Sequence, residues 1–163
     1  MHPPEEALRH HSTGPESTGW LAAMLAPWIE PGDLILLEGD LGSGKTHFAR
    51  ALVRALAGDP DLEVPSPSFP LLLPYTGPVG PILHADLYRL APDAAIDDLG
   101  LFEDPAAISI VEWPDRAPAL EAMAHLRLKF DMLTEPDQRH ITVSFNRIDA
   151  GRAESLARAL TTG

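Results

Sequence analysis

A glycine-rich segment suited to binding phosphate runs from Gly39 to Thr46. It reads Gly-Asp-Leu-Gly-Ser-Gly-Lys-Thr and fits the pattern G-x-x-x-x-G-K-[ST] at every fixed position. Glycine permits backbone angles that turn N–H groups inward around a phosphate, the lysine adds a cation, and the threonine hydroxyl is an oxygen ligand for Mg²⁺. We therefore expect these residues to hold a nucleotide and its metal: Asp40, Leu41, Gly42, Ser43, Gly44, Lys45 and Thr46.

The residues on both sides of this segment are those that a phosphate-binding loop requires. LILLE at 34–38 is a short apolar run typical of a buried parallel strand, and 47–57 repeats apolar residues at helical spacing. A helix that starts near Lys45 points the positive end of its dipole at the bound anion. The order strand, loop, helix thus supports the prediction.

Two acidic residues end other apolar runs. Asp86 follows 81–85, and Glu112 follows 108–111. If those strands lie parallel to 34–38, both carboxylates reach the same sheet edge as the glycine-rich loop. There they can bind the metal and position the water that attacks a phosphate. The alternative for each is a helix N-cap or a solvated loop acid.

The loop at 66–69, Ser-Pro-Ser-Phe, carries two hydroxyl groups and is stiffened by proline. In nucleotide switches, a loop after the first helix senses the γ-phosphate. The alternative is a rigid proline turn anchored by Phe69. Trp113, directly after Glu112, is expected either to pack against the site or to be buried at a strand end.

Alternating apolar runs and helical or turn-rich stretches predict an α/β fold. We expect a P-loop NTPase-like domain with a mostly parallel central sheet and helices on both faces. The short connections after residue 125 suggest antiparallel late strands. The apolar runs lie at 70–75, 81–85, 107–111, 125–130 and 140–145, and the helical stretches at about 92–99, 115–124 and 151–161.

The N-terminal part divides into a tail and a first helix. Residues 1–15 contain three histidines and no periodicity, which predicts a flexible tail, whereas 16–163 is expected to be one P-loop ATPase domain. Apolar residues at helical spacing over 17–28 predict a helix capped by Ser17 or Thr18.

Composition narrows the functional class. The chain has 163 residues, 12 basic and 24 acidic residues and a formal charge of −12, which argues against broad direct contact with nucleic acid. There is no cysteine, so thiol chemistry is excluded. No signal peptide pattern and no long apolar stretch are visible, and we expect a cytoplasmic protein with no membrane contact.

Together, these motifs resemble one family, TsaE, the P-loop ATPase that acts with TsaB and TsaD in making threonylcarbamoyladenosine in tRNA. The similarity extends over about 17–145. It is carried by the segments T-G-W-L at 18–21, P-G-D at 31–33, LLEGDLGSGKT at 36–46, V-P-SPSF at 64–69, HADLYRL at 84–90, VEWP at 111–114 and by Arg139.

The resemblance implies ATP and Mg²⁺ as cofactors and TsaD and TsaB as partners, with tRNA reached only indirectly. Lys45 and Thr46 would hold phosphate and Mg²⁺, while Asp86 and Glu112 would serve metal binding and hydrolysis. Further nucleotide contacts would come from three positions: Thr18, His47 and Arg139. His47 and Ser68 stand where the family usually has threonine.

Two other classes of enzyme share such a loop. Asp-Asp-Leu-Gly at 97–100 and Asn-Arg-Ile-Asp at 146–149 resemble the D-x-x-G and N-K-x-D segments of small GTPases. A small-molecule kinase would need an arginine-bearing lid and an acceptor pocket, for which the chain offers little length. Both remain alternatives to the ATPase.

Overall fold

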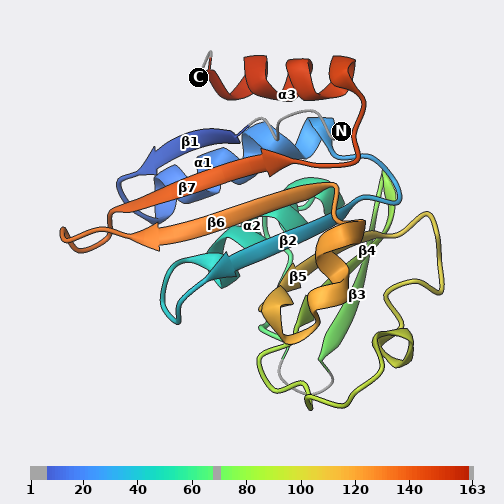
Figure 1. Ribbon diagram of the computed structural model, residues 1–163. Coiled ribbons are helices and arrows are strands. Elements are labelled where there is room, and N and C mark those ends of the chain that lie inside the picture. Colours follow the sequence, from blue (N-terminus) through green and yellow to red (C-terminus); the bar gives the residue numbers. More distant parts are fainter. Residues whose placement is uncertain (1–6, 68–70, 162–163) are drawn as a thin grey trace.

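The computed structural model describes residues 7–67 and 71–161, which share one seven-stranded sheet (Figure 1). The strands are β1 (Ala7–Ser12), β2 (Leu34–Gly39), β3 (Leu72–Gly77), β4 (Gly80–Asp86), β5 (Ile108–Glu112), β6 (Leu126–Met132) and β7 (Arg139–Phe145). The α-helices are α1 (Pro15–Leu25), α2 (Lys45–Ala57) and α3 (Ala150–Thr161). The 3₁₀ helices are η1 (Ala26–Trp28), η2 (Ile96–Leu99), η3 (Pro114–Arg116) and η4 (Pro118–Met123).

The sheet has the order β1-β7-β6-β2-β5-β4-β3. Its four central strands, β6, β2, β5 and β4, are parallel to one another. β7 runs antiparallel to β6 and β1, and β3 runs antiparallel to β4. The predicted parallel core and the antiparallel late strand are both confirmed.

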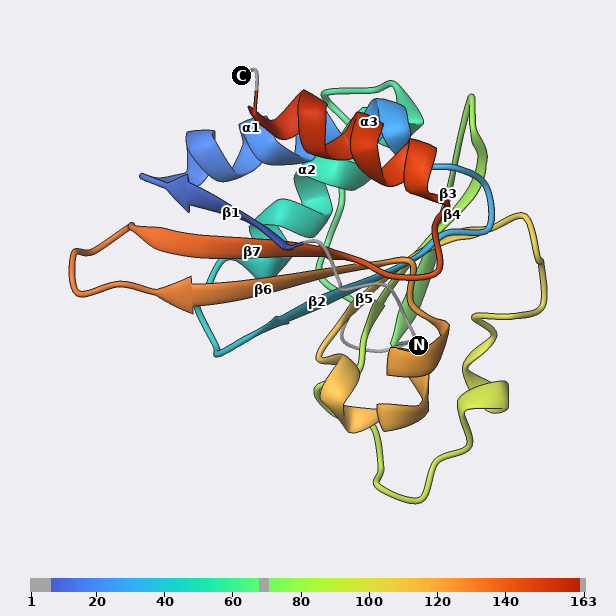
Figure 2. The ribbon, with the colours of Figure 1, turned by 45° about the horizontal axis from the view of Figure 1, so that its top comes forward.

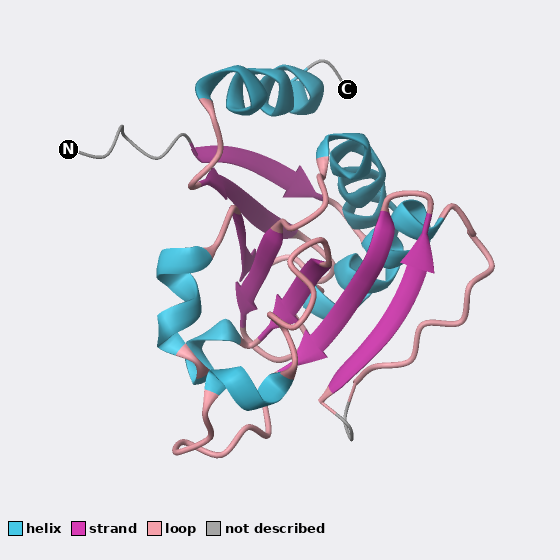
Figure 3. Ribbon diagram, turned by 90° about the vertical axis from the view of Figure 1, so that its right-hand side faces the viewer, coloured by secondary structure: helices cyan, strands magenta, loops and turns pink. Residues whose placement is uncertain are grey.

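The two faces of the sheet are covered differently. α1, α2 and α3 pack on one face, where Phe48, Leu52 and Leu21 join the main apolar core. The other face carries a smaller core around Leu36 and Leu120, covered by 3₁₀ helices and loops. Figure 2 and Figure 3 show the sheet between these two layers. Helices therefore lie on both faces, as predicted.

The helical stretches predicted at 92–99 and 115–124 are 3₁₀ rather than α-helical. Only Ile96–Leu99 is helical in the first stretch, and the second consists of η3 and η4. Pro118 lies inside the second stretch, where it lacks the N–H that a continuous α-helix would need and keeps Ala117 out of the helical conformation. Short tight helices are the result.

α1 starts earlier than expected, and the predicted side-chain cap is wrong. Pro15 is in the first turn and Gly14 is the N-cap, with no side-chain capping bond. Proline suits this position because its missing N–H would have no partner there. The Thr18 hydroxyl instead lies 2.7 Å from the Ser12 hydroxyl.

Part of the predicted N-terminal tail is a strand, and that expectation is wrong for residues 7–12. β1 pairs with β7 along its whole length, from Ala7 opposite Ser144 to Ser12 opposite Arg139. The His10 ring also stacks on Trp20 at 5.4 Å between centroids. Main-chain bonds to a distant strand stabilise this segment, whereas its own side-chain pattern is short and polar. Residues 1–6 lie outside the described range.

None of the helices in the described part of the chain is long and apolar enough to cross a membrane.

Candidate functional site

The glycine-rich loop lies at the carboxyl edge of the parallel strands, between β2 and α2. Gly39 has a φ of 154°, and a Cβ atom there would lie 2.6 Å from Ser43 Oγ and 2.8 Å from the Phe130 carbonyl oxygen. Gly44 has a φ of 105° and is the N-cap of α2. Glycine is required at both positions, because a side chain would clash at Gly39 and strain the backbone at Gly44.

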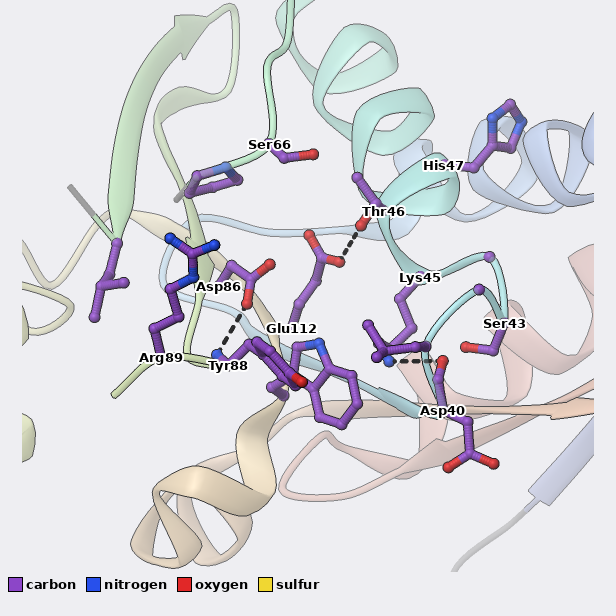
Figure 4. A pocket seen from close by; sticks show the side chains of 16 residues that line it. Asp40, Ser43, Lys45, Thr46, His47, Ser66, Asp86, Tyr88, Arg89 and Glu112 are labelled. Carbon is purple, nitrogen blue, oxygen red and sulfur yellow. Dashed lines mark hydrogen bonds between the residues drawn. The ribbon is translucent and has the colours of Figure 1, made fainter. Parts of the chain in front are cut away.

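A cavity of about 380 Å³ opens beside this loop (Figure 4). Residues 40–47 form one wall. The others come from the segment after α2 and from the ends of β4 and β5: Ser66, Pro67, Leu71, Asp86, Tyr88, Arg89, Glu112 and Trp113. The structure therefore brings the predicted loop, both predicted acids and part of the predicted switch segment around one space.

Lys45 is held back against the loop that precedes it. Its Nζ donates hydrogen bonds to the carbonyl oxygens of Gly39 and Asp40, the latter at 3.1 Å, and the residue is 4% exposed. Nζ also lies 3.7 Å from the centroid of a Trp113 ring. Burial lowers the pKa of Lys45, while the carboxylates of Glu112 and Asp86 act in the opposite direction. Trp113 thus packs against the site.

Glu112 joins the loop to the sheet through both carboxylate oxygens. The Thr46 hydroxyl donates to Oε1 at 2.5 Å, and His84 Nε2 lies 2.7 Å from Oε2. Glu112 is 1% exposed and His84 is fully buried. A buried carboxylate with a partner on each oxygen has one fixed orientation. His84 was not predicted as a site residue; its place two positions before Asp86 in HADLYRL was the available signal.

Asp86 lies beside Glu112 at the end of the neighbouring strand, because the two residues are register partners in the parallel β4–β5 pair. Its Oδ1 accepts a hydrogen bond from the Tyr88 N–H at 2.9 Å. Burial raises the pKa of Asp86 and so does Glu112, whereas the Tyr88 N–H and the side chains of His84 and Lys45 lower it. The prediction that both acids reach the loop edge is confirmed.

The switch segment is tied to α2 by arginine. Arg50 Nε donates to the Val64 carbonyl oxygen at 2.9 Å, and its Nη2 donates to Ser66 Oγ at 2.8 Å. Ser66 lines the cavity. Ser68 and Phe69, the other half of the predicted switch, lie outside the described residues.

Three further predicted contacts have different positions. His47 lines the cavity, and its Nε2 lies 2.9 Å from the Pro15 carbonyl oxygen. Thr18 is buried against Ser12 and is not in the cavity wall. Arg139 approaches the loop from outside the cavity, where Nε donates to Ser43 O at 2.8 Å and Nη2 to Gly42 O at 3.1 Å.

Comparison with known proteins agrees with this geometry. Residues 12–141 match the family described as "Threonylcarbamoyl adenosine biosynthesis protein TsaE". The protein of that name from Rickettsia conorii is 38% identical over 65% of this chain and 61% of its own length. The Bacillus subtilis protein is 37% identical over 65% of this chain and 66% of its own length, so the chain spans slightly less than two thirds of both relatives.

A third relative, the TsaE protein from Rickettsia felis, is 35% identical over 74% of this chain and 70% of its own length. Among solved structures, Bacillus subtilis YdiB is similar, with a TM-score of 0.73 and 26% identity over 97% of this chain and 98% of the YdiB chain. The family match covers the loop, both acids and Arg139. This chain therefore belongs to the TsaE family of threonylcarbamoyl adenosine biosynthesis proteins.

Proposed function

We propose that this protein binds ATP with Mg²⁺ and hydrolyses it in the cytoplasm, as the ATPase that works with TsaB and TsaD in tRNA modification. The observation that carries the proposal is the bond between the Thr46 hydroxyl and Glu112 beside Lys45, at the mouth of a glycine-rich loop. The charge of −12 supports contact with tRNA through partners rather than directly.

The residues present fit ATP and Mg²⁺. Ser43 Oγ lies in the loop wall of the cavity and is buried with no hydrogen-bond partner among the described residues. Within that part of the chain, no three His, Cys, Asp or Glu side chains converge to hold a metal alone. Magnesium is usually bound through one or two carboxylates and completes its shell with phosphate, water and other oxygen ligands such as a hydroxyl. Thr46, Glu112 and Asp86 would be its ligands here.

Hydrolysis needs charge neutralisation and an oriented water molecule. Mg²⁺, when bound, would supply positive charge beside the phosphates. Lys45 adds a second cation from the loop, and Glu112 is fixed by Thr46 and His84. Asp86 accepts a single described hydrogen bond, from the Tyr88 N–H, and its carboxylate lines the cavity next to Glu112. These two acids are the candidates for holding the attacking water.

The topology argues against the GTPase alternative. Phe145 lies opposite Leu126 at the start of β6, whereas Arg139 lies opposite Met132 at its end. Because β7 is antiparallel to the central strands, the segment 146–149 follows the edge remote from the loop. A guanine-reading segment has to lie at the nucleotide edge. Residues 97–100 also do not line the cavity.

Nucleotide hydrolysis tests the proposal, with ATP compared against GTP for the chain alone and with TsaB and TsaD added. We expect ATP turnover that is weak alone and rises with both partners. Lys45→Ala should abolish nucleotide binding, and Glu112→Ala should spare much of the binding but lose turnover. A preference for GTP, or no response to the partners, would contradict the proposal.

A further inference from the structure

Arg89 is the second cation of the cavity wall. Among the described residues that line the cavity, only Lys45 and Arg89 carry a permanent positive charge, against the carboxylates of Asp40, Asp86 and Glu112. Figure 4 shows Lys45 and Arg89 on opposite sides of Glu112. The two cations therefore approach the same space from different walls.

The guanidinium of Arg89 makes no contact, among the described residues, that would stabilise the fold. Arg89 is exposed, and within residues 7–67 and 71–161 it forms no hydrogen bond, ion pair or ring contact. The neighbouring arginines all have such contacts. Arg50 holds the 64–66 segment, Arg139 binds the loop carbonyls, and Arg116 lies 5.3 Å above the Tyr88 ring.

The charges around the cavity favour a phosphate as the ligand of the Arg89 guanidinium. Lys45 approaches from the loop, and bound magnesium would lie on the side of its ligands Thr46, Glu112 and Asp86. For terminal phosphate oxygens that face away from both, Arg89 is the remaining Lys or Arg side chain among the described residues that line the cavity. A guanidinium presents paired N–H donors in a plane, a geometry that matches two phosphate oxygens.

We propose that Arg89 binds the γ-phosphate of ATP and stabilises the charge on it during hydrolysis. This role rests on the ATPase function proposed above. Water forms the new bond to the γ-phosphorus, and the bond to the β–γ bridging oxygen breaks with its electron pair remaining on ADP. The proton lost by water passes to phosphate or solvent. Arg89 keeps all of its protons and contributes charge and two donors only.

A contact with the γ-phosphate alone has a distinct signature. ADP lacks that phosphate, so loss of Arg89 should leave ADP affinity within about 2-fold while kcat for ATP falls about 100-fold or more. A non-hydrolysable ATP analogue should bind the Arg89 variant more weakly than it binds the unaltered chain. Damage to the loop would instead weaken ADP and the analogue together.

The experiment compares Arg89→Ala, Arg89→Lys and the control Arg116→Ala in the full chain with TsaB and TsaD. Arg116 lies 5.3 Å from the centroid of the Tyr88 ring and does not line the cavity, so its variant should keep its kcat. Arg89→Lys should be intermediate, because lysine keeps the charge and loses the paired donors. Unchanged thermal unfolding would show that the variants fold.

The outcomes separate this role from the proposed function. If the unaltered chain hydrolyses ATP and Arg89→Ala matches it, the role of Arg89 is wrong and the ATPase stands. Equal losses of ADP and analogue affinity would also overturn the role. If the unaltered chain neither binds nor hydrolyses ATP, both proposals fail.

Discussion

His84 Nε2 on β4 lies 2.7 Å from Glu112 Oε2 on the adjacent strand β5, and both side chains are buried. The same carboxylate accepts the Thr46 hydroxyl on its other oxygen. His84 therefore sets the orientation of the acid that meets the first residues of α2. His84 does not line the cavity, yet it fixes the side-chain orientation of Glu112, which does.

Replacing His84 should disturb the orientation of the Glu112 carboxylate while leaving nucleotide binding largely intact. With His84→Leu, Glu112 Oε2 loses its partner, and magnesium-dependent ATP hydrolysis should fall about 10–100-fold, as for other residues that orient metal ligands. ADP binding without magnesium should change little. His84→Gln can place an amide N–H near the same oxygen and should restore part of the activity. Equal losses in both variants would show that packing, not this hydrogen bond, is responsible.

Arg139 should act through the backbone of the phosphate-binding loop. Arg139→Met keeps the aliphatic stem near Gly44 but removes the donors to Ser43 O and Gly42 O. Without these two bonds the loop has to be ordered when ADP binds, and we expect ADP affinity to fall by about 10-fold. Isothermal titration of ADP measures this. Arg147→Met, at the far end of β7, is the control, and an equal loss there would contradict the interpretation.

Arg152 should be a major contributor to stability. Its guanidinium donates to both carboxylate oxygens of Asp33 and to the Trp28 carbonyl oxygen, which joins α3 to the turn before β2. The side chains of Arg152 and Asp33 are only 10% and 5% exposed. Arg152→Met leaves Asp33 buried without its cation, and we expect the free energy of unfolding to fall by about 3 kcal/mol.

Urea denaturation gives this value, and Arg158→Ala on the same helix is the matched control. Arg158 pairs with Glu154 at the surface, where both side chains are about 70% exposed. Arg158→Ala should lower the free energy of unfolding by at most about 0.5 kcal/mol. Similar losses in the two variants would show that the Asp33 contact contributes little.

His125 should make the fold less stable in mild acid. Leu34 N–H donates to its Nδ1 at 3.0 Å, which requires an unprotonated nitrogen. Burial lowers the pKa of His125, as do Arg147 and Arg152, while Asp33 opposes them. The unfolded chain therefore takes up this proton more readily than the folded chain. Stability is fully present above about pH 6.5 and decreases as the pH falls below that value.

Thermal unfolding between pH 7.5 and 5.5 tests this dependence. His125→Asn keeps an acceptor for the Leu34 N–H and cannot titrate, so its Tm should decrease less over that range. His10, whose pKa burial also lowers, supplies a further decrease of the same sign that the variant retains. An unchanged slope in His125→Asn would exclude His125 as a source of the pH dependence.

The phosphate-binding loop and the two acids were accessible from the sequence for a simple reason. Gly39 to Thr46 is one continuous pattern whose neighbours already show strand and helix periodicity. Asp86 and Glu112 each end an apolar run, and parallel strands bring such ends to one edge. These features depend on residues close together in the chain and on one rule of sheet geometry.

The tertiary structure decided the contacts between distant segments. His84 and Glu112 are 28 residues apart, and Arg139 and Ser43 are 96 apart. β1 is held by main-chain bonds to β7, which leave no periodic side-chain pattern to recognise. Local spacing in the sequence determines which residues lie at the strand ends beside the phosphate-binding loop. Which of them meet there, and which bind the loop from outside, depends on strand order and on packing across the whole sheet.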